Sequence, residues 1–255
     1  MSLPFLGAAI AVETRKAAAS RTLWATMVLV ASGIAILSGA FALARADGSG
    51  IVAAKLALLV HGSGWAGFIE IAEQITAAGV LLAFGIGMTW ILGREFLDHT
   101  VSGLFALPVP LRSIALAKLV VALSWCALVT LFTVASLAVV GLALGFGLPE
   151  GDALLALARE AALCLLTALL SVPCAWAVTL SRGLLAGIGT AVGLVVSAQV
   201  AVVAGIGEWW PGSAPALWAV QPDAIPAGAL ALVAVVPLVF GALTVAAWSR
   251  LELDR

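Results

Sequence analysis

The stretch LVVALSWCALVTLFTVASLAVVGLALGFGLP, residues 119–149, contains no acidic or basic side chain, although Lys118 precedes it and Glu150 follows it. An α-helix rises about 1.5 Å per residue, so about twenty residues are enough to cross ~30 Å of hydrocarbon. The stretch exceeds this length without a single charge. It therefore predicts a membrane-spanning helix.

The composition of the whole chain agrees with this prediction. Of its 255 residues, 64% are hydrophobic and only 10% are charged, whereas a soluble domain carries about 25% charged residues. The mean hydropathy is +1.21. The formal net charge of −1 provides no general attraction to nucleic acid, and no nucleic-acid motif is present. A soluble globular domain and a nucleic-acid-binding protein are therefore not expected.

Further charge-free stretches of similar length occur along the chain: Thr22–Ala44, Gln74–Gly93, Ala161–Ser181, Gly183–Gly207 and Ala224–Ser249. Together with the first stretch they predict an all-α, polytopic fold with six transmembrane helices in a single membrane domain, residues 21–255. The expected spans cover about residues 22–44, 66–93, 113–146, 156–181, 183–207 and 224–249. Ile51–Val60 is too short to cross and predicts an interfacial or extracytoplasmic helix.

The basic residues predict the orientation of these spans. With a cytoplasmic N-terminus, most basic residues lie inside: Arg15, Lys16, Arg21, Arg94, Arg112, Lys118, Arg182, Arg250 and Arg255. Only Arg45, Lys55 and Arg159 then lie outside. Because cytoplasmic loops carry an excess of Lys and Arg, both termini are expected in the cytoplasm. Acidic and basic residues precede the first apolar run, unlike a cleavable secretory signal, so we expect the first span to be retained.

Three segments differ from simple connections. Residues 1–20 carry apolar side chains at helical spacing and predict an N-terminal amphipathic interfacial helix. Residues 94–112 form the longest expected cytoplasmic loop, and as a helix they would share an apolar face made of Leu97, Val101, Leu104 and Phe105. An exposed apolar face of this kind indicates a partner. Residues 208–226, rich in Trp and Pro, predict a folded or re-entrant outer loop.

Residues in the 94–112 loop resemble the permease subunits of type-2 ABC transporters. That family shows an acidic residue, a Thr, a Leu-rich turn, Pro-Val, an Arg and a Lys, which correspond here to Glu95, Thr100, Leu104, Leu107-Pro108-Val109, Arg112 and Lys118. Two departures are present: His99 replaces a common Gly, and Pro110-Leu111 adds one residue before Arg112. The run from Trp209-Trp210-Pro211 to Pro215 is similar to the outer loop of the bacitracin and lantibiotic-export branch.

The resemblance implies that the loop is a coupling helix docking on a separate ABC ATPase. The coupling residues would be Glu95, Phe96, Leu97, Thr100, Val101, Leu104, Phe105, Pro108 and Arg112. No GxxxxGK[ST] phosphate loop accompanies any lysine of this chain, so we expect no catalytic residue and no bound cofactor, with ATP and Mg²⁺ held by the partner. The family pairs two permeases with two ATPases in the cell membrane, which implies a multi-pass protein of a bacterial inner membrane that also contacts lipid.

Two GxxxG pairs in the fifth span are candidates for the seam between permeases. They are Gly183 with Gly187 and Gly189 with Gly193, and packing within the chain explains them equally well. By resemblance, the second and fifth spans line the pathway. The pathway candidates are Glu70, Glu73, Phe84, Met88, Thr89 and Gln199. An apolar wall suits a hydrophobic or amphiphilic cargo such as a drug, a peptide antibiotic or a lipid, and the corresponding roles are export and antibiotic resistance.

Several polar residues have a second interpretation. Glu70 and Glu73 could bind a cation or gate the outer exit, but a solvated helix start is favoured because both lie near the expected interface. Arg159 and Glu160 are interpreted as interfacial anchors. Gln199 could instead bond another helix. The cysteines, which all fall within apolar runs, are interpreted as packing residues. They are Cys126, Cys164 and Cys174.

Other functional classes remain as alternatives. A partnerless secondary transporter or channel usually buries ionisable residues at mid-membrane, and the spans here are nearly free of them. An ABC permease serving cofactor maturation or lipid handling is not separated from an exporter by the sequence. A protease built on His61 and Ser63 lacks a second base on the same side, because His99 lies in the opposite loop. The histidines and cysteines are too scattered to form a metal site.

Overall fold

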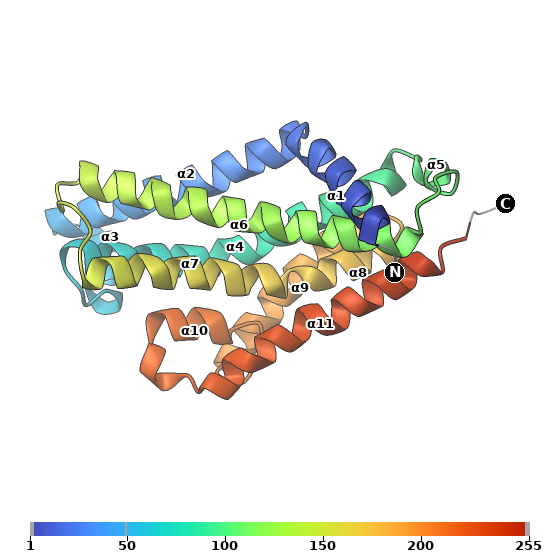
Figure 1. Cartoon of the computed structure of the whole chain (residues 1–255). Helices are drawn as coiled ribbons and strands as arrows, with labels where there is room; N and C mark the ends of the chain where they lie inside the picture. Colours follow the sequence, from blue (N-terminus) through green and yellow to red (C-terminus); the bar gives the residue numbers. More distant parts are fainter. Residues whose placement is uncertain (1–2, 49, 253–255) are drawn as a thin grey trace.

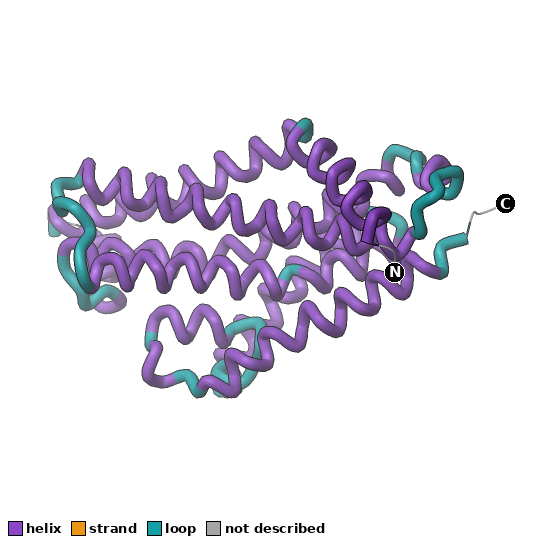
Figure 2. The backbone as a smooth tube through the Cα atoms, in the orientation of Figure 1, coloured by secondary structure: helices purple, strands orange, loops and turns teal. Residues whose placement is uncertain are grey.

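The computed structural model describes residues 3–48 and 50–252, and within them the chain is all-helical, with 83% helix and no strand. Among these residues, six helical segments are long and apolar enough to cross a membrane: Arg21–Asp47, Gly64–Leu97, Leu111–Ala143, Asp152–Ser181, Leu184–Val203 and Ala227–Ser249. Figures 1 and 2 show them as an elongated bundle. The prediction of six transmembrane helices is confirmed. Residues 1–2 of the predicted interfacial segment and residues 253–255 of the membrane domain lie outside the described residues.

Helix α1, Leu3–Ala18, meets helix α2, Arg21–Asp47, at a sharp bend and packs against helix α6, Leu111–Ala143. Ser20 caps α2, because its hydroxyl accepts a hydrogen bond from the Leu23 amide at 3.4 Å. The Trp24 indole donates to the Ala18 carbonyl at 2.8 Å and closes the bend from the other side. The start of α1 and the end of helix α11, Ala227–Ser249, lie at the end of the bundle that carries α5, Val101–Leu104, which we call the loop end.

Helix α4, Gly64–Leu97, is the central element, and it packs against α2, α6, α7 and α9. Its large side chains are buried in the main hydrophobic core, as Phe84, Met88 and Leu92 illustrate. Gly87 allows the closest approach, since a Cβ there would collide with the Trp125 ring of α6. The Trp125 ring also packs edge-on against Phe84, with 6.2 Å between ring centroids. This interlocking makes α4 a firm mechanical link along the bundle.

The fourth span is broken rather than continuous. Helix α7, Asp152–Leu170, ends at Ser171, and helix α8, Val172–Ser181, begins with Pro173 in its first turn. Proline lacks the amide hydrogen that would continue the helical ladder, which explains why the segment divides here. The Ala168 carbonyl accepts both the Ser171 hydroxyl at 2.7 Å and the Ser171 amide at 3.2 Å, which closes the end of α7 at the break.

The opposite end of the bundle is closed by a short connection. Helix α3, Gly50–Leu59, packs on α2 and is followed by a turn at residues 60–63. The Arg45 guanidinium donates to the carbonyls of Gly62 and Val60 at 2.6 and 2.9 Å. Elsewhere, α9, Leu184–Val203, is followed by a folded segment with α10, Ala214–Val220, and a 3₁₀ turn, Pro222–Ala224, before α11. A folded outer loop was the sequence expectation for this segment.

Candidate functional site

The loop between α4 and α6 is not a single helix, so the prediction of one continuous apolar face is wrong. Helix α4 extends to Leu97, which makes Glu95, Phe96 and Leu97 its last turn. The chain then turns at Asp98 and His99, and His99 adopts a left-handed φ of 54° that interrupts the helical path. Only one further helical turn follows, in α5. Leu97 therefore does not share a continuous helical face with Val101 and Leu104.

The inward side of this loop is a small hydrophobic core of its own. Its buried members are Phe96, Leu104, Ile114, Ala115 and Trp248. They come from the end of α4, from α5, from the start of α6 and from the end of α11. Val101 is partly buried against the same cluster. The loop is therefore fixed to three helices that run through the bundle, and a force on it reaches all three.

The outward side of the loop is apolar as well. Leu97 is 52% exposed, Phe105 37% and Leu107 50%. We call these three residues the loop surface. Thr100, Pro108 and Arg112 from the predicted coupling set are also exposed around it. Leu104 and Glu95 are buried, so they cannot contact a partner in this conformation and instead support the surface from below. Exposed apolar side chains beyond the ends of membrane helices indicate a protein contact.

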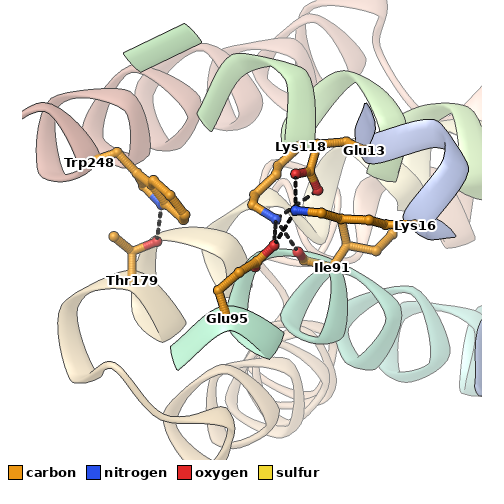
Figure 3. Close-up of polar contacts among 7 residues, drawn as sticks. All are labelled: Glu13, Lys16, Ile91, Glu95, Lys118, Thr179 and Trp248. Carbon is orange, nitrogen blue, oxygen red and sulfur yellow. Dashed lines mark hydrogen bonds and ion pairs between the residues drawn. The ribbon is translucent and has the colours of Figure 1, made fainter. Parts of the chain in front are cut away.

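Beneath the loop surface lies a buried ionic cluster (Figure 3), which we call the ionic latch. The Lys118 ammonium of α6 donates to Glu95 Oε1 of α4 at 2.6 Å and to Glu13 Oε2 of α1 at 2.8 Å. Its third hydrogen bond goes to the Ile91 carbonyl at 3.3 Å. Lys16 of α1 donates to Glu13 at 2.7 Å and to Glu95 at 3.0 Å. Two cations and two carboxylates thus connect α1, α4 and α6.

The burial of the latch determines its energetic role. The Lys118 side chain is fully buried, and those of Glu13 and Glu95 are 5–6% exposed. Buried ions of this kind are stable only while they stay paired. Partial burial on its own lowers the pKa of Lys16, but hydrogen bonds and attraction from Glu13 and Glu95 raise it overall above its usual 10.5. The latch therefore keeps Lys16 charged and holds α1 against the bundle.

Helix α11 joins the same region. The Trp248 indole donates to the Thr179 hydroxyl of α8 at 3.0 Å, and its ring lies 5.9 Å from the Lys118 ammonium. Phe96 packs against the Trp248 ring at 5.7 Å between centroids. The loop surface, the latch and the last turn of α11 therefore form one connected body at the loop end.

The glycine pairs of α9 divide by face. Gly187 packs within the chain, since a Cβ there would collide with Thr89 of α4. Gly189 and Gly193 are exposed, and an added Cβ would meet nothing within 4 Å. Gly183 precedes the helix and has only a backbone neighbour at 3.7 Å. Of the predicted seam residues, only Gly189 and Gly193 leave a face of α9 open for a second helix.

The predicted pathway residues lie in different environments. Phe84, Met88 and Thr89 are buried in the packed core. Gln199 lines a cavity of about 260 Å³ between α4, α7, α9 and α10. Glu70 supports the turn after α3, because its carboxylate accepts the amide hydrogens of His61 at 2.8 Å and Gly62 at 3.2 Å. Its visible role is to fix that turn.

Two acidic residues are placed differently from the sequence interpretation. Glu73 was expected at a solvated helix start, but its side chain is 1% exposed. Glu160 was expected as an interfacial anchor, but it is fully buried and accepts a hydrogen bond from the Thr76 hydroxyl at 2.5 Å. Both corrections have one cause: the packing of α4 against α7 covers the faces that carry these residues. The burial of Glu73 and Glu160 also weakens the argument against a secondary transporter, which was that the spans are nearly free of buried ionisable groups.

Sequence reasoning missed the latch and part of the loop surface. Leu107 was noted only as part of a motif, although it is half exposed beside Phe105. Lys118 was placed at the start of a span. The apolar turn that precedes it, residues 114–117, is the sequence signal that could have indicated its burial. Glu13 and Lys16 are three residues apart in α1, a spacing at which helical side chains can pair, and this pair is half of the latch. Their partners, 79 to 105 residues away, had no local signal.

Comparison with known proteins identifies one family. A family model described as ABC-2 family transporter protein matches residues 9–199, from α1 to the C-terminal half of α9. The match includes the loop surface and every residue of the ionic latch. Among curated proteins, no sequence matches the chain.

Proposed function

The chain belongs to the ABC-2 family of transporter proteins, and from this premise we propose that it is the permease subunit of an ATP-driven exporter coupled to its ATPase through the loop surface. Family membership and six apolar helices make it a multi-pass protein of the cell membrane. A permease of this family is a transport subunit that works with an ABC ATPase. What remains to be proposed is the contact, the assembly, the pathway and the cargo.

The observation that carries the coupling proposal is the combination of an exposed and a buried side in one short loop. Leu97, Phe105 and Leu107 project outward, while Leu104 and Phe96 tie the same loop to α6 and α11. A partner that grips the outer side moves the packed inner side with it, because close-packed interiors transmit displacement rather than absorb it. The excess of basic residues expected at this end supports a cytoplasmic location for it, where a soluble ATPase is available.

The ionic latch extends the proposed coupling from the loop to three helices of the bundle. Glu95 lies in the last turn of α4, directly before the loop turns, and Lys118 lies two turns into α6. Their ion pair makes the ends of α4 and α6 move together, and Glu13 carries α1 with them. ATP and Mg²⁺ bind in the partner, and this chain supplies the mechanical link.

The proposed assembly contains two permeases and two ATPases. The open face of α9, which carries Gly189 and Gly193, supports a permease seam, because small residues let helices approach closely in lipid. Gly187 is excluded from that seam by its packing against Thr89. A second copy of this chain is the partner we propose for this face.

The proposed pathway runs beside α4 and α9, where the 260 Å³ cavity lies beneath α10. Its walls are mainly apolar, with Gln74, Thr167, Gln199 and Ser213 as the polar exceptions. Such a surface suits an amphiphilic or hydrophobic cargo: a drug, a peptide antibiotic or a lipid. Export of an antibiotic would confer resistance, and lipid handling or cofactor maturation would use the same architecture.

Co-purification tests the proposal. The chain is co-expressed with a small Walker-motif ATPase encoded beside it, and the complex is isolated from membranes through a tag on the permease. Leu97→Asp with Leu107→Asp should abolish recovery of the ATPase, because both changes lie on the loop surface. Leu148→Asp, at an exposed position between α6 and α7 at the opposite end of the bundle, is the matched control and should retain it. Equal recovery with the two Asp substitutions would contradict the proposed contact.

A further inference from the structure

A pair of buried carboxylic acids lies between α4 and α7, outside the coupling region. Glu73 is 1% exposed and Glu160 is fully buried. The Thr76 hydroxyl donates to Glu160 Oε1, and Thr76 lies one turn after Glu73 on α4. The Glu160 carboxylate therefore sits against the same stretch of α4 that carries Glu73.

The two residues lie at a similar depth in the bundle. Helices α4 and α7 both begin at the end of the bundle that carries α3 and run toward the loop end. Glu73 follows the start of α4 by nine residues and Glu160 follows the start of α7 by eight, which places them about 14 and 12 Å along their helices. A helical side chain leans toward the N-terminus of its own helix, so Glu160 leans from Thr76 toward the level of Glu73.

Each carboxylate retains one buried oxygen with no hydrogen-bond partner: Oε1 of Glu73 and Oε2 of Glu160. Both oxygens lie where water is excluded, and an ionised carboxylate there needs a cation or a donor. The other charged groups that act on Glu73 are Arg159 and Glu70. Arg159 is half-buried, but its guanidinium forms no ion pair with Glu73 or Glu160 in the part of the chain that the structure describes, and Glu70 is occupied with the backbone amides of the turn after α3.

A proton fits this arrangement better than a metal ion. Within the described residues, no group of three or more His, Cys, Asp or Glu is placed to hold a metal. The hydroxyl of Thr76 and the thiol of Cys164 are the polar groups beside Glu160, and Cys164 Sγ is 3.9 Å from its Oε1. The two carboxylates interact electrostatically across the contact between α4 and α7, and like charges at short range favour protonation of one of them.

We propose that Glu73 and Glu160 form a proton-binding site and hold one exchangeable proton between them while α4 and α7 are packed. The proton comes from water at the α3 end: one O–H bond of a hydronium ion breaks, one forms on a carboxylate oxygen, and no other bond changes. Separation of α4 from α7 hydrates both groups and releases the proton. Movement of the pathway helix α4 is then linked to proton uptake and release, which goes beyond ATP-driven coupling and does not depend on it.

Infrared spectroscopy tests the site directly. Purified protein in lipid nanodiscs at neutral pH should show a carboxylic-acid C=O stretching band, because protonated acids absorb apart from carboxylates. Glu73→Gln and Glu160→Gln should each reduce this band, since each removes one partner of the shared proton. Glu150→Gln removes an exposed carboxylate and should leave the band unchanged. A wild-type spectrum without the band, or a band that survives both Gln substitutions, would overturn the proposal.

Thermal unfolding provides the second measurement. A proton held only in the folded state stabilises the protein at low pH, and this contribution is lost as the pH rises. The wild-type unfolding temperature should therefore fall between about pH 5 and pH 8 more steeply than that of the double variant E73Q/E160Q. Equal slopes would contradict the proposal. A double variant that is destabilised at every pH would indicate a bound cation in place of the proton and would also contradict it.

Discussion

Replacement of Lys118 with Met should destabilise the protein more than any other single change at the loop end. The substitution keeps the length of the side chain and removes all three hydrogen bonds, to Glu95, Glu13 and the Ile91 carbonyl. It leaves two buried carboxylates with only Lys16, whose side chain is 33% exposed. Removing one partner of a buried ion pair costs about 3–5 kcal/mol. For a chain of this size that loss corresponds to a fall of roughly 6–20 °C in unfolding temperature.

The assay is thermal unfolding of the purified protein in detergent, followed by tryptophan fluorescence. Lys55→Met is the matched control, because Lys55 is exposed on α3 and its loss should change little. Adding Glu95→Gln to Lys118→Met should recover part of the loss, since it removes one of the two uncompensated charges. If Lys118→Met unfolds at the same temperature as Lys55→Met, the latch does not hold the helices together and our reasoning is refuted.

Two further predictions concern helix packing and pH. Gly187→Val should lower the stability of the single chain by about 1–3 kcal/mol, because the new side chain overpacks against Thr89. Gly189→Val should change that stability by no more than ~0.5 kcal/mol and should instead weaken self-association, measured by crosslinking in membranes. Equal effects of the two substitutions on stability would contradict the assignment of faces. Because the pKa of Lys16 is raised, the stabilisation from its pairing with Glu13 is fully present below pH 10.5 and is lost as the pH rises above that value. Hydrogen exchange in α1 should therefore accelerate only under strongly alkaline conditions. Fast exchange in α1 at neutral pH would show that Lys16 does not help to anchor the helix.

Much of the fold is accessible from sequence because a bilayer imposes a length and excludes charge. The stretch after Lys118 and the charge-free run of α2 each satisfy this condition without reference to any partner. Which face of a span is buried is a different matter. Glu73 lies among apolar residues on α4, and only the packing of α7 decides that it faces protein rather than water.

The candidate site shows the same limit. The spacing of Leu97, Val101 and Leu104 fits a helix, but the left-handed backbone of His99 separates Leu97 from the other two. Nothing in the apolar spacing indicates this break. The pairing of Lys118 with Glu13 depends on α1 folding back onto α6, and sequence separation of 105 residues leaves no local pattern to reveal it.

The central claim, that the loop surface contacts an ABC ATPase, is tested most directly by site-specific crosslinking. The native cysteines Cys126, Cys164 and Cys174 are all buried, so a cysteine introduced at Leu107 is selectively accessible. We predict that Leu107→Cys forms a crosslink to the co-expressed ATPase and that Val203→Cys, 88% exposed at the C-terminal end of α9, does not. A crosslink at Val203 without one at Leu107 would contradict the account.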